Sequence, residues 1–158
     1  MIRLDDRDLK ILTVLQSDGR ITKSALAEKV HLSPTACWER LKRLEDAGVI
    51  ESYAARIDPR LLAGATEVIV SIELDSHRAE DFEAFETAIE TVPEITECYA
   101  VGGGFDYMMK VCAPDVAAYQ SLIDGLLDRA IGIKRYYTYI VTKGIKRAPV
   151  PVGRLIGT

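Results

Sequence analysis

Hydrophobic positions in the first 48 residues recur at helical spacing and fall into three segments. The first segment, 5–18, carries leucines at three-residue intervals behind two aspartates, which can cap a helix and favour its positive end. Thr22 can cap a second, short helix. Ser33-Pro34 supplies the N-cap and first-turn proline of a third helix, and Gly48 suits its end. The pattern therefore predicts three consecutive helices.

After residue 48 the period changes from helical to strand-like. Residues 49–53 and 54–57 predict two short extended pieces, which could form a small hairpin, or wing. Asp58-Pro59 interrupts any strand, and residues 61–65 predict a linker to a second domain.

The second half of the chain repeats one order of elements. A strictly alternating stretch is followed by a segment of helical spacing and by another extended stretch, and the order then recurs. The predicted elements lie at 66–75, 82–92, 95–101, 106–112, 116–126 and 133–142. This β-α-β unit, present twice, predicts a ferredoxin-like domain with both helices on one face of a four-stranded sheet. The other face, bearing Tyr99 and Tyr137, needs a cover, for which a second copy of the chain is the simplest source.

We therefore expect an α+β protein of two domains. A winged helix-turn-helix occupies 1–60, and a ferredoxin-like βαββαβ domain, whose uncovered sheet face suits dimerisation, occupies 66–143. A tail follows at 144–158, where prolines stop regular structure. The sequence leaves open whether this tail joins oligomer contacts or is loose.

The third predicted helix carries the candidate DNA-binding surface. At 100° per residue, Cys37, Leu41 and Leu44 share one stripe that faces the core. On the other side, a hydroxyl can reach base edges, a glutamate can accept from a cytosine amino group, and cations can hold phosphate or guanine. The expected DNA-binding residues are Ser33, Thr35, Ala36, Glu39, Arg40, Lys42 and Arg43. A solvated amphipathic helix is the alternative, and the role of Trp38 stays open.

A glycine-rich turn, Gly102-Gly103-Gly104, followed by Asp106, is the candidate small-molecule site. Exposed backbone N–H groups in such a turn can hold a carboxylate, and a nearby acid can hold an ammonium, so the pair suits a free amino acid. The alternative is an ordinary tight turn with a solvated aspartate. A phosphate loop is a poor interpretation, because no helix follows the glycines.

Composition excludes several classes of protein. The chain has 158 residues, of which 48% are hydrophobic and 28% charged, which is typical of a globular protein. It has no apolar run of the roughly 20 residues that cross a bilayer and no signal-peptide pattern, so we expect a cytoplasmic protein without membrane contact. The net charge of −4 favours no nucleic-acid partner by itself, so the DNA hypothesis depends on a local surface.

The sequence gives little support for disulfide bonds, a metal site or catalysis. Three cysteines without C-x-x-C spacing predict reduced, packed thiols, and two separated histidines predict no metal site. The sequence contains no nucleophile, base and orienting group in a recognisable set, so we expect neither an enzyme nor a bound cofactor.

Several motifs together resemble the Lrp/AsnC family of bacterial and archaeal transcription regulators. They are residues 4–8 with Ile11-Leu12, Asp18-Gly19-Arg20, Leu26-Ala27, residues 32–37, residues 40–50 and Gly103-Gly104-Phe105-Asp106-Tyr107. The resemblance implies DNA-binding homodimers paired through the effector-domain sheets, with further assembly to tetramers or octamers. It also implies a small amino-acid-like effector bound between these domains, with Gly103, Gly104, Asp106, Thr138, Tyr139 and Ile140 as the effector-binding residues. Gly102 stands where the family often has Thr or Ser, so the effector's identity does not carry over.

The leading hypothesis is thus a sequence-specific regulator whose binding to double-stranded DNA responds to a small amino acid or derivative. The alternative is a small-molecule-binding module or enzyme built on the ferredoxin-like domain, with the N-terminal domain used for protein contact.

Overall fold

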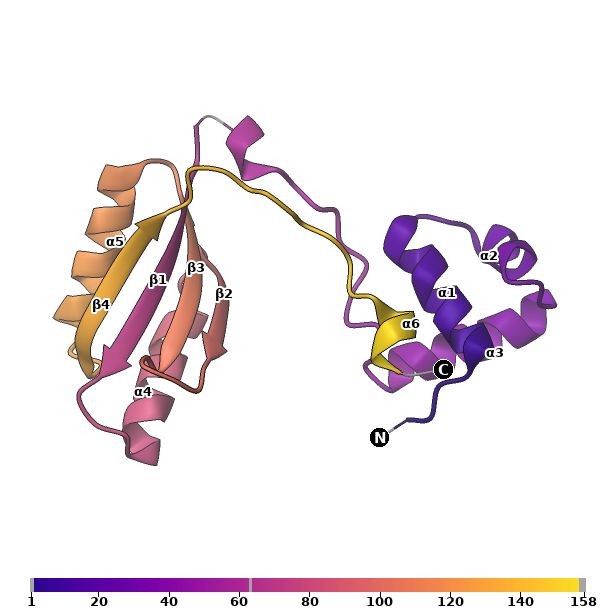
Figure 1. Ribbon diagram of the computed structural model, residues 1–158, viewed down its shortest axis with the longest axis horizontal. Helices are drawn as coiled ribbons and strands as arrows, with labels where there is room; N and C mark the ends of the chain where they lie inside the picture. The colour runs from indigo at the N-terminus through magenta and orange to yellow at the C-terminus, as the bar shows by residue number, and fades with distance from the viewer. Residues whose placement is uncertain (1, 63, 157–158) are drawn as a thin grey trace. The chain divides into compact units, whose positions relative to one another are not determined.

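A computed structural model describes residues 2–62 and 64–156 of the chain. The chain divides into two compact units, one formed by Met1–Arg56 with Lys146–Thr158, and the other by Ile57–Ile145 (Figure 1). Helices α1 to α3 form most of the first unit. The second unit contains a sheet with helices α4 and α5.

The three N-terminal helices begin at the predicted caps. Helix α1 (Asp6–Ser17) is capped by Asp5 in a capping box with Asp8, and α2 (Lys23–Lys29) by Thr22. Helix α3 (Pro34–Asp46) starts with Ser33, whose hydroxyl accepts from the backbone N–H of Ala36 at 3.3 Å. These short-range signals define the start of each helix, so the prediction of three helices is confirmed.

The core of the first unit is formed where the helices meet. Cys37, Leu41 and Leu44 of α3 are buried against apolar side chains of α1 and α2, as the helical spacing predicts. Burial also raises the pKa of the Cys37 thiol, which favours a packing role for this residue. The opposite side of α3 is therefore left exposed.

The expected hairpin at 49–57 does not form. Residues 51–58 have no regular secondary structure, and the four strands of the described chain all belong to the second unit. A strand requires a partner for its backbone groups, and strand-like composition alone does not supply one. Within this chain, the wing is an extended segment rather than a paired hairpin.

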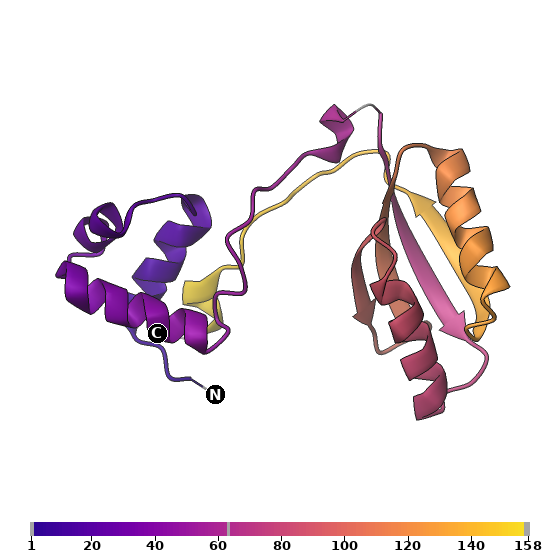
Figure 2. The ribbon, with the colours of Figure 1, turned by 180° about the vertical axis from the view of Figure 1, so that it is seen from behind.

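The second unit is an antiparallel four-stranded sheet in the order β2-β3-β1-β4. Its strands are β1 (Thr66–Leu74), β2 (Ile95–Ala100), β3 (Tyr107–Ala113) and β4 (Ile133–Ile140). Helices α4 (Ala79–Glu90) and α5 (Val116–Asp128) lie on the same side of the sheet (Figure 2). The predicted ferredoxin-like arrangement is confirmed.

Alternation along the strands places the hydrophobic core under the two helices. Val68, Val70, Ile72 and Leu74 of β1 are buried there with Phe85 of α4. The remaining positions of each strand face the other side, where no helix of the chain covers the sheet in the described structure.

The C-terminal segment returns to the first unit. A short helix, α6 (Val152–Leu155), lies beside α1, and Val152 packs against the N-terminal core. The structure thus differs from the expectation of an irregular tail, because one apolar side chain in this segment finds a place in the core of the first unit.

Candidate functional site

The exposed side of α3 carries one continuous set of side chains. Thr35 lies one turn before Glu39, and both are exposed. Trp38 and Lys42 lie beside them, also one turn apart, and Trp38 is 41% exposed. We call these four residues, Thr35, Trp38, Glu39 and Lys42, the α3 face. In the described structure, Thr35, Glu39 and Lys42 make no side-chain hydrogen bond or ion pair, so their polar groups are accessible to a partner.

Two of the expected DNA-binding residues point instead toward α1. Nη1 of Arg40 lies 2.9 Å from Oδ1 of Asp8, and Nη2 of Arg43 lies 2.6 Å from Oδ2 of the same carboxylate. Nη1 of Arg40 also lies 2.7 Å from Asp5. The guanidinium groups therefore fasten the recognition-helix candidate to the start of the first helix.

The Asp8 carboxylate explains why these pairs matter for the fold. Its side chain has no exposed surface, and its Oδ2 also accepts from the backbone N–H of Asp5 at 2.9 Å. A buried carboxylate needs such partners, since leaving one unpaired costs several kcal/mol. The sequence reasoning missed Asp8 because it lies 32 residues from Arg40, and a helical projection shows only the exposed direction of a cation.

Ser33 and Ala36 have local roles at the start of α3. The Ser33 hydroxyl is occupied as the N-cap acceptor, and Ala36 is half-buried. Direct contact of Ser33 and Ala36 with DNA stays a prediction.

A second cation lies on the flank of the α3 face. Nζ of Lys23, the first residue of α2, lies 3.2 Å from the centroid of the Trp38 ring. This distance is well within the range of a cation–π interaction. Neither residue was among the expected contacts, because their separation in sequence hides the pairing.

The candidate effector turn is tied to the start of the loop after β1. Oδ2 of Asp106 accepts from the backbone N–H of Leu74 at 2.8 Å, and Oδ1 lies 3.0 Å from Nε2 of His77. Gly103 has a φ of +152°, which side chains rarely adopt. The aspartate thus has a structural task at the end of the sheet, and His77, which the sequence analysis treated as an isolated residue, is its neighbour.

The predicted effector turn lies at one end of β1, and residues 138–140 pair with β1 from its middle toward its other end. The N–H of Asp106 donates to the carbonyl of Ile72, whereas Ile140 pairs with Val68, four residues along β1. Four residues of strand span about 13 Å. The chain therefore brings Gly103, Gly104 and Asp106 together and leaves Ile140 apart from them, whereas Phe105 of the turn lies 5.5 Å, centroid to centroid, from the ring of Tyr137, next to Thr138.

The strand residues also differ from one another in direction. The hydroxyls of Thr138 and Tyr119 share a 2.6 Å hydrogen bond on the helix-covered side. Tyr139 pairs with Ile69 on the uncovered side, and Ile140 follows on the covered side. One ligand within a single chain cannot contact all three.

The uncovered side of the sheet is rich in large side chains. Tyr99, Met108, Ser71 and Tyr137 are consecutive partners across the four strands. The two tyrosines are 58% and 40% exposed, whereas the Ser71 hydroxyl is buried and has no hydrogen-bond partner in the described structure. Beside them, Nζ of Lys110 lies 2.9 Å from the nearly buried Glu67. We call Tyr99, Met108, Ser71 and Tyr137 the sheet face.

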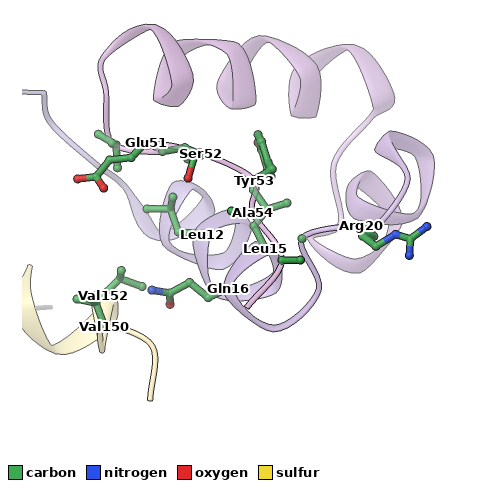
Figure 3. A pocket seen from close by; sticks show the side chains of 14 residues that line it. Leu12, Leu15, Gln16, Arg20, Glu51, Ser52, Tyr53, Ala54, Val150 and Val152 are labelled. Atoms are coloured by element: carbon green, nitrogen blue, oxygen red, sulfur yellow. The ribbon is translucent and has the colours of Figure 1, made fainter. Parts of the chain in front are cut away.

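An open groove of about 860 Å³ lies in the first unit between α1, residues 49–55 and the C-terminal segment. Figure 3 shows Leu12, Leu15 and Val152 among its apolar lining residues, with Arg20 at one end. The Tyr53 hydroxyl donates to Glu45, and burial together with that carboxylate raises the pKa of Tyr53 to about 12. No nucleophile and base are paired in the lining of the groove. We interpret the groove as the place where α1, residues 49–55 and the C-terminal segment pack together, and not as an active site.

The described residues were also compared with what a metal site and a membrane-spanning helix require. No group of three His, Cys, Asp or Glu side chains in this part of the chain is arranged to hold a metal ion. Among the described helices, none is both long and apolar enough to span a bilayer.

Comparison with known families matches each half of the chain. Residues 4–51 match the winged helix-turn-helix DNA-binding domain. Residues 67–151, more than half of the chain, match the Lrp/AsnC ligand binding domain. The two matches follow the order of the two units.

Relatives of known name match almost the whole chain. The transcriptional regulatory protein DoeX of Halomonas elongata is 55% identical over 146 residues, which cover 92% of each protein. The leucine-responsive regulatory protein of Escherichia coli is 41% identical, and the match covers 92% of this chain and 88% of that protein.

A solved structure agrees with the whole described fold. A transcriptional regulator from Neisseria meningitidis, solved as a complex with L-Met, is 32% identical, with a TM-score of 0.87. The match covers 97% of this chain and 99% of that one.

Proposed function

Because the chain belongs to the Lrp/AsnC family of transcriptional regulators, we propose that the α3 face contacts DNA through a defined subset of the expected residues. Thr35 and Glu39 meet base edges in the major groove, and Lys42 meets a phosphate. The accessibility of these three side chains carries the proposal. Family membership favours a regulator over the alternative of an enzyme, and a regulator of chromosomal genes acts in the cytoplasm.

Arg40 and Arg43 have a different part in this proposal. Their ion pairs with Asp8 set the position of α3 relative to α1, and through it the direction of the α3 face. Arg43 donates through Nη2 to Asp8 and through Nη1 to the carbonyl of Arg3 at 3.4 Å, and its side chain remains 45% exposed, which leaves it within reach of a phosphate. Arg40 acts as a positioning residue.

The ligand-binding domain responds to a small molecule with amino and carboxyl groups. The L-Met complex of the Neisseria meningitidis regulator supports this chemical class. The exposed backbone of Gly103 and Gly104 offers N–H donors to the carboxylate, and Asp106, already shared with His77, attracts the ammonium.

A second copy of the chain completes the assembly. The sheet face presents exposed tyrosine and methionine side chains around the buried Ser71, and an isologous dimer would cover the exposed side chains. Because the turn lies at one end of β1 and Ile140 pairs toward the other end, a site that uses both requires two chains, and we propose that the dimers assemble further to tetramers or octamers.

Two recognition helices in such a dimer would read a pseudo-palindromic site with half-sites about 34–36 Å apart, or a multiple of this distance. The test is a titration of promoter fragments from the gene's own genomic surroundings, with and without each of the common amino acids. We expect salt-dependent DNA binding and a change in affinity of about 5- to 150-fold with the effector. DNA affinity that is independent of salt would contradict the phosphate contacts.

A further inference from the structure

The cation over Trp38 is fixed in a way that an ordinary surface lysine is not. Nζ of Lys23 lies 3.2 Å from the centroid of the indole ring, and the indole is 41% exposed, so the pair lies at the protein surface. In the described structure the ammonium makes no hydrogen bond or ion pair, which leaves its N–H groups for an external acceptor.

Holding an ammonium here has a cost that the indole offsets. Lys23 is the first residue of α2, where the positive end of the helix dipole repels a cation. A lysine side chain also loses considerable rotamer freedom when it is fixed. The face of an indole attracts a cation and so compensates for part of both costs. The result is a positive charge held in place before any partner arrives.

The ammonium of Lys23 lies next to the α3 face. Trp38 lies three residues after Thr35 and four before Lys42, so the indole is a direct neighbour of both on the helix surface. The ammonium held over it borders the same face from the α2 side. Arg40 is engaged with Asp5 and Asp8, whereas Lys23 lies over the indole ring and Lys42 lies one turn along α3 from Trp38.

We propose that Lys23 contacts a phosphate of the DNA backbone and that Trp38 is the residue that positions it. In a helix-turn-helix the first helix of the motif crosses the backbone while the second enters the major groove, and α2 and α3 are these two helices. A fixed cation loses less freedom on binding an anion than a mobile one does. The contact adds affinity and orientation without sequence preference. This inference rests on the proposed DNA binding by α3.

The test measures DNA affinity of the full-length protein as a function of KCl concentration, by fluorescence anisotropy of labelled duplexes. Lys23→Met removes the charge and keeps the stem, and Lys10→Met, on the exposed side of α1, is the matched control. For Lys23→Met we expect the slope of log K against log[KCl] to become shallower by about 0.9 for each bound subunit. Affinity should fall roughly tenfold, equally for specific and unrelated duplexes. Lys10→Met should retain the parent slope.

Trp38 gives an independent measure because it is the only tryptophan of the chain. Lys23→Met should change its emission in the free protein, and DNA should change the emission of the parent. Trp38→Leu should weaken DNA binding while leaving the salt slope unchanged, since the charge is still present, and Trp38→Phe should restore part of the affinity. Circular dichroism of each variant identifies any loss of folding.

The outcomes separate this inference from the function on which it rests. A parent protein that binds DNA, with Lys23→Met retaining the parent slope, overturns the phosphate contact and leaves the proposed function standing. Equal affinities for Trp38→Leu and the parent overturn the positioning role. A parent that shows no salt-dependent DNA binding overturns both.

Discussion

Arg40 and Asp8 form an ion pair that ties the third helix to the first, with Nη1 of Arg40 at 2.9 Å from Oδ1 of a carboxylate that has no exposed surface. The charge of Arg40 therefore stabilises the folded protein in the absence of DNA. Without Arg40, the buried carboxylate of Asp8 keeps only Arg43 and the backbone N–H of Asp5 as partners.

Arg40→Ala should lower the free energy of unfolding by about 2–3 kcal/mol, because a buried carboxylate loses a charged hydrogen-bond donor. Lys42→Ala, on the exposed side of the same helix, should change it by less than about 0.5 kcal/mol. Urea unfolding followed by far-ultraviolet circular dichroism measures both. Equal stabilities of the two variants would contradict the structural role of Arg40.

The same ion-pair cluster gives the protein an acid sensitivity. The backbone N–H of Asp8 and the Arg40 guanidinium lower the pKa of Asp5 from 3.8 to about 2. The unfolded chain therefore takes up this proton at higher pH than the folded chain does. The stabilisation is complete above about pH 4 and is lost as the pH falls to about 2.

Asp5→Asn should remove this part of the pH dependence, since asparagine keeps the helix cap without the charge. Because Asp5 is half-exposed, solvent screening limits the effect to about 1 kcal/mol. Unfolding curves at steps between pH 2 and pH 6 test this expectation. Identical curves for parent and variant across this interval would show that Asp5 contributes nothing to acid stability.

Two substitutions of Asp106 distinguish its structural role in the sheet from its role in binding a ligand. Asp106→Asn keeps an acceptor for the Leu74 N–H, so its melting temperature in the absence of effector should stay close to that of the parent. Asp106→Ala leaves that N–H without its acceptor and should lose about 1–2 kcal/mol.

Both variants lack the charge that attracts an ammonium, so both should lose the rise in melting temperature that an effector amino acid causes in the parent. Basal DNA binding should remain in Asp106→Asn. Retention of the full effector response by Asp106→Asn would rule out this carboxylate as the ammonium partner.

The sheet face should control assembly. Tyr137→Glu places a charge among Tyr99, Met108 and Ser71, where a dimer would bury it, and should shift the protein toward monomer. Glu83→Lys, on the exposed side of α4, is the control and should assemble like the parent. Light scattering after size exclusion gives both masses. An unchanged mass for Tyr137→Glu would place the dimer contact elsewhere.

Sequence reasoning succeeded where the determining interactions are local. Thr22 and Ser33 mark helix starts because a cap bonds to an N–H three residues away, and the strands are visible because alternation repeats every second residue. It failed where the partner is distant in sequence. The pairing of Arg43 with Asp8 spans 35 residues, and the wing composition gave no information about whether a paired strand exists.

The candidate sites show the same division. Thr35 and Glu39 were identified from helical spacing, which also determines their exposure. The contact between His77 and Asp106 was not predicted, because Asp106 is brought near His77 only by the pairing of β1 with β3. The separation of Asp106 from Ile140 depends on strand register, which the sequence pattern does not specify along a sheet.

The central claim, that the α3 face reads base edges, is tested most directly by the sequence preference of a variant of that face. Selection of bound duplexes from a random pool, repeated with Glu39→Gln, compares the base preference of the variant with that of the parent. We predict a changed preference at one position of each half-site, with a cost of about 1–3 kcal/mol for the original base there and unaltered folding. An identical preference in parent and variant, at equal affinity, would contradict base reading by Glu39 and the orientation of α3 on which the account depends.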